Sequence, residues 1–228
     1  MGNPYINSEL FLFLQDLRAN NNREWFNENK KRYLSVLRDP LLMMIEDFGP
    51  ILHSISPHFT AIPKASGGSL FRIYRDLRFS ANKDPYKTHA GIHFRHAAGK
   101  DAHAPGYYLH LEPENVFIAL GIWHPEMVVL KRIRNSIVSD PEAWTSIIHD
   151  PAFSDTYRLE GESLRRAPKG YDADHPLIED LRRKDFAGVC RMNQDDALKP
   201  DFLEILADTW RTGNRFMRYL TEIGGHPY

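Results

Sequence analysis

The stretch YYLHLEPENVFIALG (residues 107–121) decides the fold class, because it joins two runs of alternating apolar and polar side chains through a two-residue turn. Side chains alternate between the two faces of a β-strand, so these runs predict strands over residues 107–112 and 115–121. The short Pro113-Glu114 connection predicts that the two strands are antiparallel neighbours. The same pattern predicts further strands over residues 70–75, 89–96 and 186–192, and an irregular or extended segment over residues 157–168.

Helical periodicity occupies the sequence on both sides of these strands. Apolar residues three and four positions apart predict helices within residues 7–60 and again from Pro125 onward. Residues 200–220 carry one apolar stripe and predict a single long helix. Short polar side chains make good N-caps, and the candidates are Ser8, Asn21, Asn22, Asp39 and Asp140.

The order of these elements predicts the fold class. Helices followed by strands and then by mixed elements are typical of an α+β protein. We therefore predict an antiparallel β-sheet with helices packed on it, in a single domain over residues 7–223. Within this domain, residues 7–60 form a helical N-terminal part, residues 69–192 contain the sheet, and residues 199–221 form a long C-terminal helix.

The composition is that of a globular protein with little overall charge. Of the 228 residues, 42% are apolar and 26% are charged, and the formal net charge of −1 gives no general attraction to nucleic acid or anionic lipid. The single cysteine, Cys190, excludes an intrachain disulfide and is typical of a reducing compartment. No run approaches the ~18 apolar residues of a membrane helix, and residues 1–22 lack the basic start of a signal peptide. We expect a cytoplasmic protein without a membrane partner.

Strand parity sorts the side chains of the predicted sheet into two unlike faces. The apolar set is expected to face the core and comprises Phe71, Ile73, Ile92, Phe94, Tyr107, Leu109, Leu111, Val116, Ile118 and Leu120. The opposite set comprises Arg72, Tyr74, His93, Arg95, Tyr108, His110, Glu112, Phe117, Ala119 and Gly121. This second face is either a binding floor, where small residues leave room beside Tyr and His, or the plain wet face that antiparallel sheets commonly have.

Positive charge is concentrated in RIYRDLRFSANKDPYKTH (residues 72–89, the basic loop), which holds five Lys or Arg against two Asp. Arg binds phosphate or carboxylate through paired hydrogen bonds and Lys adds a point charge, so a small anion is the expected ligand. The predicted anion-binding residues are Arg72, Arg75, Arg78, Lys83 and Lys87. The catalytic candidates, as groups able to accept, donate or shuttle a proton, are Asp76, Tyr86 and His89. The alternative is an ion-pair network that only pins a long connection.

The sequence FRIYRDLRFSANKDPYKTH (residues 71–89) resembles the bacterial and fungal family called domain of unknown function 2461. Four further motifs fit the same family: NNREWFNENKKRY (21–33), GYYLHLEP (106–113), RRAPKGYDADHP (165–176) and LRRKDF (181–186). The likeness covers roughly residues 7–220. The resemblance implies a single-domain intracellular protein, and it supplies no established reaction, cofactor or catalytic residue.

Six of the eleven histidines fall between residues 89 and 124, yet their spacing does not predict a metal site. On a strand, His89 and His93 would lie ~13 Å apart, which is too far for both to bind one ion. A cross-strand pair such as His93 with His110 remains open, but no further ligand motif accompanies it. We therefore predict neither a metal nor a cofactor.

Three functions are consistent with these residues. We predict that the protein binds a small phosphate- or carboxylate-bearing ligand at the basic loop, with or without catalysis. One alternative is a nucleic-acid or protein interaction module that uses the Arg/Tyr/His sheet face, because Tyr and His stack on unpaired bases. The other is a purely structural basic loop. The overall charge disfavours nucleic acid, and the sequence does not specify the oligomeric state.

Overall fold

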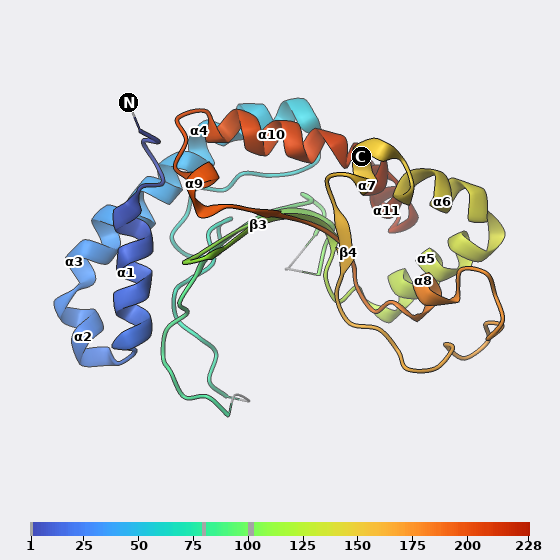
Figure 1. Cartoon of the computed structure of the whole chain (residues 1–228), viewed down its shortest axis with the longest axis horizontal. Helices are drawn as coiled ribbons and strands as arrows, with labels where there is room; N and C mark the ends of the chain where they lie inside the picture. Colours follow the sequence, from blue (N-terminus) through green and yellow to red (C-terminus); the bar gives the residue numbers. More distant parts are fainter. Residues whose placement is uncertain (1, 79–80, 100–102) are drawn as a thin grey trace.

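A computed structural model describes residues 2–78, 81–99 and 103–228 and has the predicted α+β architecture (Figure 1). In these residues, one antiparallel sheet has the strand order β1-β2-β3-β5-β4. The strands are β1 (Ala90–Arg95), β2 (Gly106–Glu112), β3 (Asn115–Ile122), β4 (Arg158–Glu160) and β5 (Phe186–Met192). Four predicted strands are thereby confirmed, and β4 is the short extended part of the segment predicted over 157–168.

The segment predicted as a strand over residues 70–75 is not one. Its backbone pairs first with β1 and then with its own returning chain, where the amide of Lys87 donates to the carbonyl of Ile73 at 2.7 Å. Because the partner changes within a few residues, only isolated bridges form, at Leu70–Ile92 and Tyr74–Tyr86. The alternation of apolar and polar residues indicates an extended backbone, but it does not predict which neighbouring segment that backbone pairs with.

Phe71 consequently departs from the parity prediction. Ile73 is buried as expected, but Phe71 is only partly buried. The ring of Phe71 lies 6.0 Å from that of His93 and 6.1 Å from that of Tyr108. Phe71 therefore belongs to the second face of the sheet and not to the core.

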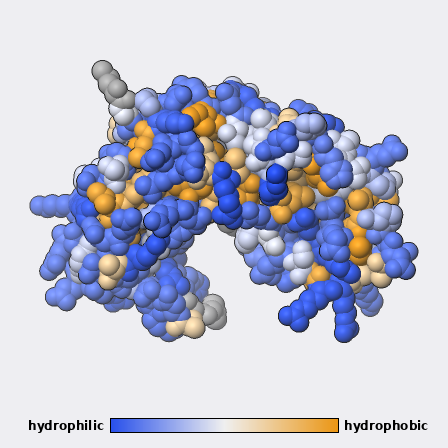
Figure 2. All heavy atoms as spheres, in the orientation of Figure 1, coloured by the Kyte–Doolittle hydropathy of each residue, from blue (hydrophilic) through white to orange (hydrophobic). Residues whose placement is uncertain are grey.

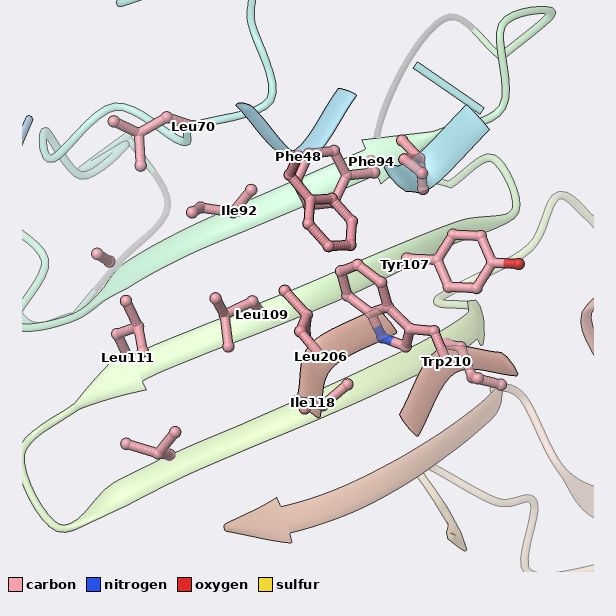
Figure 3. Close-up of a cluster of buried hydrophobic side chains, with 14 of the residues drawn as sticks. Phe48, Leu70, Ile92, Phe94, Tyr107, Leu109, Leu111, Ile118, Leu206 and Trp210 are labelled. Atoms are coloured by element: carbon pink, nitrogen blue, oxygen red, sulfur yellow. The ribbon is translucent and has the colours of Figure 1, made fainter. Parts of the chain in front are cut away.

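One face of the sheet packs against α4 (Asp39–Ile55) and α10 (Phe202–Thr212), and this layer holds the hydrophobic core (Figure 3). The Phe48 and Trp210 rings are 5.4 Å apart above the strands. A fully buried side chain of this kind contributes about 1.5–3 kcal/mol through the hydrophobic effect. The predicted core-facing residues of β1, β2 and β3 are at most 2% exposed: Ile92, Phe94, Tyr107, Leu109, Leu111, Val116, Ile118 and Leu120.

The remaining helices lie mainly at the two ends of the molecule (Figure 1). Asn22 and Asp140 cap α2 and α6 as predicted, whereas Asn7, and not Ser8, caps α1. Asp39 caps no helix, because the π-helical turn η1 continues directly into α4. The bounds are α1 (Ser8–Ala19), α2 (Arg23–Glu28), α3 (Lys30–Tyr33), η1 (Leu34–Arg38), α5 (Met127–Ser139), α6 (Pro141–Ile148), α7 (Pro151–Ser154), α8 (Ile178–Arg182), α9 (Gln194–Ala197) and α11 (Asn214–Ile223).

The helix predicted over residues 199–221 is two helices, α10 and α11, separated at Gly213. A Cβ at this position would fall 2.2 Å from Cδ2 of Leu120 in β3, so the chain passes close to the sheet here. Glycine also disfavours a helix interior by about 1 kcal/mol relative to alanine. The apolar stripe continues through both helices, which is why periodicity alone predicts one.

The second face of the sheet is concave and open (Figure 1). The chain between α4 and β1 descends on one side of it, and the chain between β4 and α8 descends on the other. These segments and the helices beside them form two lobes, and Figure 2 shows the hollow between the lobes. Among the residues that the structure describes, no helix has the length and apolar character needed to cross a membrane.

Candidate functional site

A pocket of about 400 Å³ lies on the concave face (the concave-face pocket). Its floor is formed by β2, β3 and β5, where small side chains leave room, and its walls are largely aromatic. The small residues of the floor are Gly106, Ala119, Gly121 and Ala187. The aromatic lining residues are Phe71, Tyr108, Phe117 and Trp123. An apolar pocket with a few polar groups is the usual form of a small-molecule site.

His93 is a buried polar side chain in the lining of this pocket. It is 8% exposed, and its ring lies over Gly106, where a Cβ would fall 2.0 Å from Nε2 of His93. Neither ring nitrogen has a hydrogen-bond partner among the described residues. Burial, with a smaller effect of Arg95, lowers the pKa of His93 to about 4, so the ring is neutral at pH 7. It therefore offers one donor and one acceptor to a ligand.

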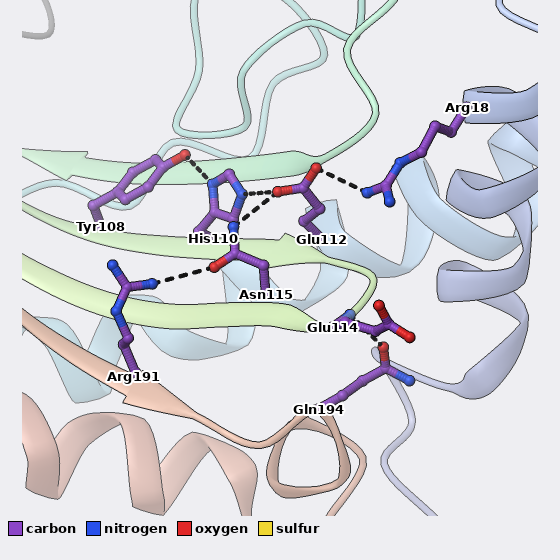
Figure 4. A network of polar contacts seen from close by, with 8 residues as sticks. All are labelled: Arg18, Tyr108, His110, Glu112, Glu114, Asn115, Arg191 and Gln194. Atoms are coloured by element: carbon purple, nitrogen blue, oxygen red, sulfur yellow. Dashed lines mark hydrogen bonds and ion pairs between the residues drawn. The ribbon is translucent and has the colours of Figure 1, made fainter.

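A chain of polar contacts runs along β2 beside the pocket (Figure 4). The Tyr108 hydroxyl lies 3.0 Å from His110 Nδ1, and His110 Nε2 lies 3.3 Å from Glu112 Oε2. Glu112 also accepts hydrogen bonds from Asn115 and from Arg18 of α1, each at 2.9 Å. Residues two apart on a strand share a face, so the local backbone alone places these three β2 side chains in a row.

Burial and pairing fix the charges along this row. Burial disfavours the Glu112 carboxylate, but the hydrogen bonds it accepts and the charge of Arg18 keep its pKa below the usual value. Burial lowers the pKa of His110, against the opposing effect of Glu112, and burial raises the pKa of Tyr108. At pH 7 the row is therefore a neutral phenol, a neutral imidazole and a carboxylate.

His110 is held between two aromatic rings. The His89 ring, just before β1, and the Phe117 ring of β3 each stack on it at 4.5 Å. The Arg191 guanidinium lies 5.9 Å from the centre of the Phe117 ring and pairs with the pocket carboxylate Glu160 at 2.8 Å. These two stacking contacts fix the orientation of the His110 ring. Separately, Arg191 neutralises the Glu160 carboxylate of the pocket.

The five basic residues predicted to bind an anion lie along the basic loop, and none of them lines the concave-face pocket. Arg78 pairs with Asp76 at 2.6 Å, and both side chains are exposed. Lys83 donates to the carbonyl of Leu77 at 3.3 Å. Arg75 is partly exposed and bonds a backbone carbonyl within the same loop. The structure therefore gives these three cations separate local contacts.

Of the five predicted basic residues, Lys87 contacts a residue that lines the pocket. Lys87 Nζ lies 5.2 Å from the centre of the Phe71 ring, which is a wall of the pocket. Burial, followed by the charge of Arg72, lowers the pKa of Lys87. In the described part of the chain, no carboxylate oxygen lies within 4 Å of this ammonium group. Lys87 therefore places positive charge beside the pocket, with Arg72 near enough to affect its pKa.

The three catalytic candidates predicted from the basic loop have different surroundings. Hydrogen bonds from Arg78 lower the pKa of Asp76 to about 2, so this carboxylate stays ionised on the surface. Tyr86 is buried and stacks on Phe26 at 4.0 Å, and burial raises its pKa. His89 alone reaches the row on β2, through its stack on His110, and burial lowers its pKa to about 4.

The cross-strand histidine pair considered as a metal site is not aligned. The register places Tyr108 opposite His93, and it places Gly91 opposite His110. Within residues 2–78, 81–99 and 103–228, no three His, Cys, Asp or Glu side chains are grouped to hold a metal ion.

The pocket and the polar row contain residues that sequence patterns do not single out. Strand parity places Tyr108, His110 and Glu112 on the second face, but the sequence analysis gives them no role. Their spacing of two residues does indicate that the three side chains lie next to one another on that face. Trp123 and Gly161 enter the pocket from beyond the ends of β3 and β4. No local sequence pattern indicates that these two residues line the pocket, because their position depends on β4 being the edge strand next to β5.

A family model described as "Conserved hypothetical protein (DUF2461)" matches residues 9–219 of the chain. The match includes every strand of the sheet and all the residues that line the concave-face pocket. In the comparison with curated proteins, none matches the chain.

Proposed function

The chain belongs to the DUF2461 family, whose description names no activity, and we propose from its site that it binds a small ligand with a flat aromatic body and an acidic group. The place of binding is the concave-face pocket. The proposal keeps the acidic ligand expected from the sequence and moves its main contacts from the basic loop to the sheet.

The main support for this proposal is His93. Its ring nitrogens have no hydrogen-bond partner among the described residues and are not sealed from the pocket, so a ligand can bond them in place of water. A hydrogen bond of this kind contributes about 0.5–1.5 kcal/mol net. The group lines a pocket of about 400 Å³, which is large enough for a small organic molecule. The ligand is therefore expected to carry a hydrogen-bonding atom that meets His93.

The shape of the pocket supports a flat ligand. Glycine and alanine at four floor positions bring the backbone of the sheet close to the bound molecule. Rings from Phe71, Phe117 and Trp123 stand around this floor. Aromatic rings favour offset-stacked or edge-to-face contacts, each worth about 0.5–1.5 kcal/mol beyond the area they bury.

Lys87 and Arg72 are the residues expected to bind the acidic group of the ligand. Lys87 stands over the Phe71 ring beside the pocket, and Arg72 is close enough to lower its pKa. A charged hydrogen bond to such a group contributes about 1.5–3 kcal/mol. Arg75 and Lys83 are expected to raise the local positive potential and attract the ligand without touching it, whereas Asp76 neutralises Arg78.

Fluorescence titration with 8-anilinonaphthalene-1-sulfonate tests this proposal, because the dye combines flat aromatic rings with an anionic group. The wild-type protein is expected to enhance the dye fluorescence saturably. Ala119→Leu fills the floor of the pocket and should abolish the saturable signal, whereas Ala152→Leu, at an exposed position of α7, should not. Equal binding by both variants would refute the proposed site.

A pair of lysine variants tests the acidic end of the ligand. Lys87→Met should weaken dye binding about tenfold, which corresponds to about 1.4 kcal/mol. Lys83→Met removes the same charge from the same loop and should change the affinity less than twofold, since among the described residues its ammonium contacts only the Leu77 carbonyl. Equal losses in the two variants would show that only the overall charge of the loop matters.

The interaction-module alternative predicts a different result. If the concave face stacks unpaired bases, a single-stranded oligonucleotide should bind far more tightly than a nucleoside monophosphate. That binding should also weaken steeply with salt, because each phosphate contact releases counterions. We expect no such preference, given the net charge of −1.

A further inference from the structure

The row on β2 has the geometry of an activated nucleophile. Tyr108 lines the concave-face pocket, and its hydroxyl lies 3.0 Å from His110 Nδ1. On the far side of the imidazole, Nε2 lies 3.3 Å from Glu112. A nucleophile within hydrogen-bond reach of a base, which is itself oriented by a third group, is the recurring arrangement of covalent catalysis.

Burial lowers the pKa of His110 and raises that of Tyr108, and two contacts of the imidazole work against this effect when the phenol proton is transferred to it. With the ring proton on Nε2 donated to Glu112, Nδ1 is free to accept the proton of Tyr108. The imidazolium that results faces the Glu112 carboxylate and lies flat on Phe117, with 11° between the ring planes. An ion pair and a cation–π contact therefore stabilise the charged form.

The backbone leaves room for the tyrosine hydroxyl at this point. A Cβ at Gly91, the β1 residue opposite His110, would fall 2.6 Å from Tyr108 Oη. Any side chain there would displace the hydroxyl from His110. The glycine is therefore required for the contact between Tyr108 and His110.

We propose that Tyr108, His110 and Glu112 act as nucleophile, base and orienting carboxylate in acyl transfer from a small aromatic ester bound in the concave-face pocket. This inference rests on the proposed function, because the ester must first occupy that pocket. His93, the cross-strand neighbour of Tyr108, donates a hydrogen bond to the carbonyl oxygen as negative charge develops on it.

The reaction balances in two steps. Tyr108 Oη bonds to the acyl carbon and gives its proton to His110 Nδ1, and the ester C–O bond breaks, so that the alcohol oxygen leaves with the bonding electrons and takes up the proton. Water then attacks the acyl carbon and gives a proton to His110. The bond to Tyr108 breaks, the phenol regains its proton from His110, and the carboxylic acid leaves.

The test uses p-nitrophenyl acetate as the ester and follows p-nitrophenolate release together with mass spectrometry of the tyrosine peptides. Acetyl should appear on Tyr108 and not on Tyr74, an exposed tyrosine that bonds no histidine among the described residues. Tyr108→Phe should lower the rate above the protein-free reaction about 100-fold, as is typical for loss of such a group. His110→Gln should lower it similarly.

A pH profile separates catalysis from a structural role of the same residues. The rate should rise with pH through the pKa of His110, because only the neutral ring accepts a proton. Glu112→Gln removes the charge that stabilises the imidazolium, so the midpoint should move to lower pH. The other titratable groups near His110 are Tyr108 and His89, with Arg18 acting through Glu112, and His89 is already neutral above about pH 4.

Dye binding distinguishes failure of this inference from failure of the proposed function. Wild-type protein should bind 8-anilinonaphthalene-1-sulfonate saturably, which reports on the pocket separately from acyl transfer. If the dye binds and Tyr108 is never acetylated, or if Tyr108→Phe reacts as fast as wild type, acyl transfer is refuted and ligand binding stands. If the dye does not bind to wild-type protein, both are refuted.

Discussion

The basic loop and the concave face of the sheet both carry chemically reactive side chains, but they differ in how those side chains are satisfied. On the loop, Arg78 and Asp76 are exposed and neutralise each other. On the sheet, His93 is buried without a hydrogen-bond partner in the described chain, and Tyr108 and His110 form part of an ordered row. A high density of charge in a sequence therefore does not by itself locate a site, whereas a polar ring that lines a pocket and bonds no described residue is available to a ligand.

The largest expected difference between the two regions concerns the space around His93. Gly106→Val places a side chain where Nε2 of His93 now lies, so the ring must leave the pocket. Overpacking of this kind costs typically 1–3 kcal/mol, and we expect a loss of about 3 kcal/mol in the free energy of unfolding, measured by urea denaturation. The variant should also lose dye binding.

Gly49→Ala is the matched control for this substitution. The nearest atom to its added Cβ is 3.7 Å away, which is ordinary contact, and Gly49 lies within α4. Alanine favours a helix interior over glycine, so the stability should be unchanged or higher. A stable Gly106→Val variant that binds the dye normally would contradict the placement of His93.

A second difference concerns the stability of the protein in mild acid. The pKa of His93 is about 4 in the folded protein and about 6.5 when the chain is unfolded, so the unfolded state binds more protons between these values. Stability is therefore full above pH 6.5 and is lost as the pH falls toward 4. Between pH 7 and pH 5, His93 alone should account for a loss of about 2 kcal/mol.

Urea denaturation of wild type and His93→Gln at the two pH values measures this contribution. His93→Gln cannot titrate, so its stability should fall less between pH 7 and pH 5. His89, whose pKa is also about 4, remains in both proteins and accounts for part of the residual loss. An identical pH dependence in the two proteins would show that His93 is not buried in its neutral form.

The smallest effect is expected on the basic loop. Asp76→Asn removes an exposed carboxylate that, in the described part of the chain, pairs with the neighbouring Arg78 of the same loop. Exposed ion pairs contribute little, because water and salt screen them. The variant should keep the melting temperature and the dye affinity of wild type, and a clear loss of either would move the functional centre back to the loop.

Most of the sheet can be predicted from the sequence, because two runs of alternating side chains joined by a short turn are compatible with few structures other than an antiparallel pair of strands. The core-facing residues from Ile92 to Leu120 follow from parity alone. The segment over residues 70–75 could not be predicted, since its backbone changes partner after leaving β1. The break at Gly213 depends on a contact with Leu120, which lies far away in the sequence.

The candidate site could be predicted only in part. Alternation places His93, Tyr108 and His110 on one face, and it does so because side-chain direction is a local property of the backbone. Whether that face is open, covered or hollow depends on the two lobes on either side of it. Trp123 and Gly161 complete the pocket only because the chain returns through β4 and β5.

The central claim is tested most directly by ¹H–¹⁵N spectra of the histidine side chains and of the backbone amides, recorded during titration with 8-anilinonaphthalene-1-sulfonate. We predict that the ring nitrogens of His93 shift saturably as a ligand bonds them, while the backbone amides of Asp76 and Arg78 stay unchanged. Shifts of those loop amides with unchanged His93 resonances would contradict the claim that the concave-face pocket is the binding site.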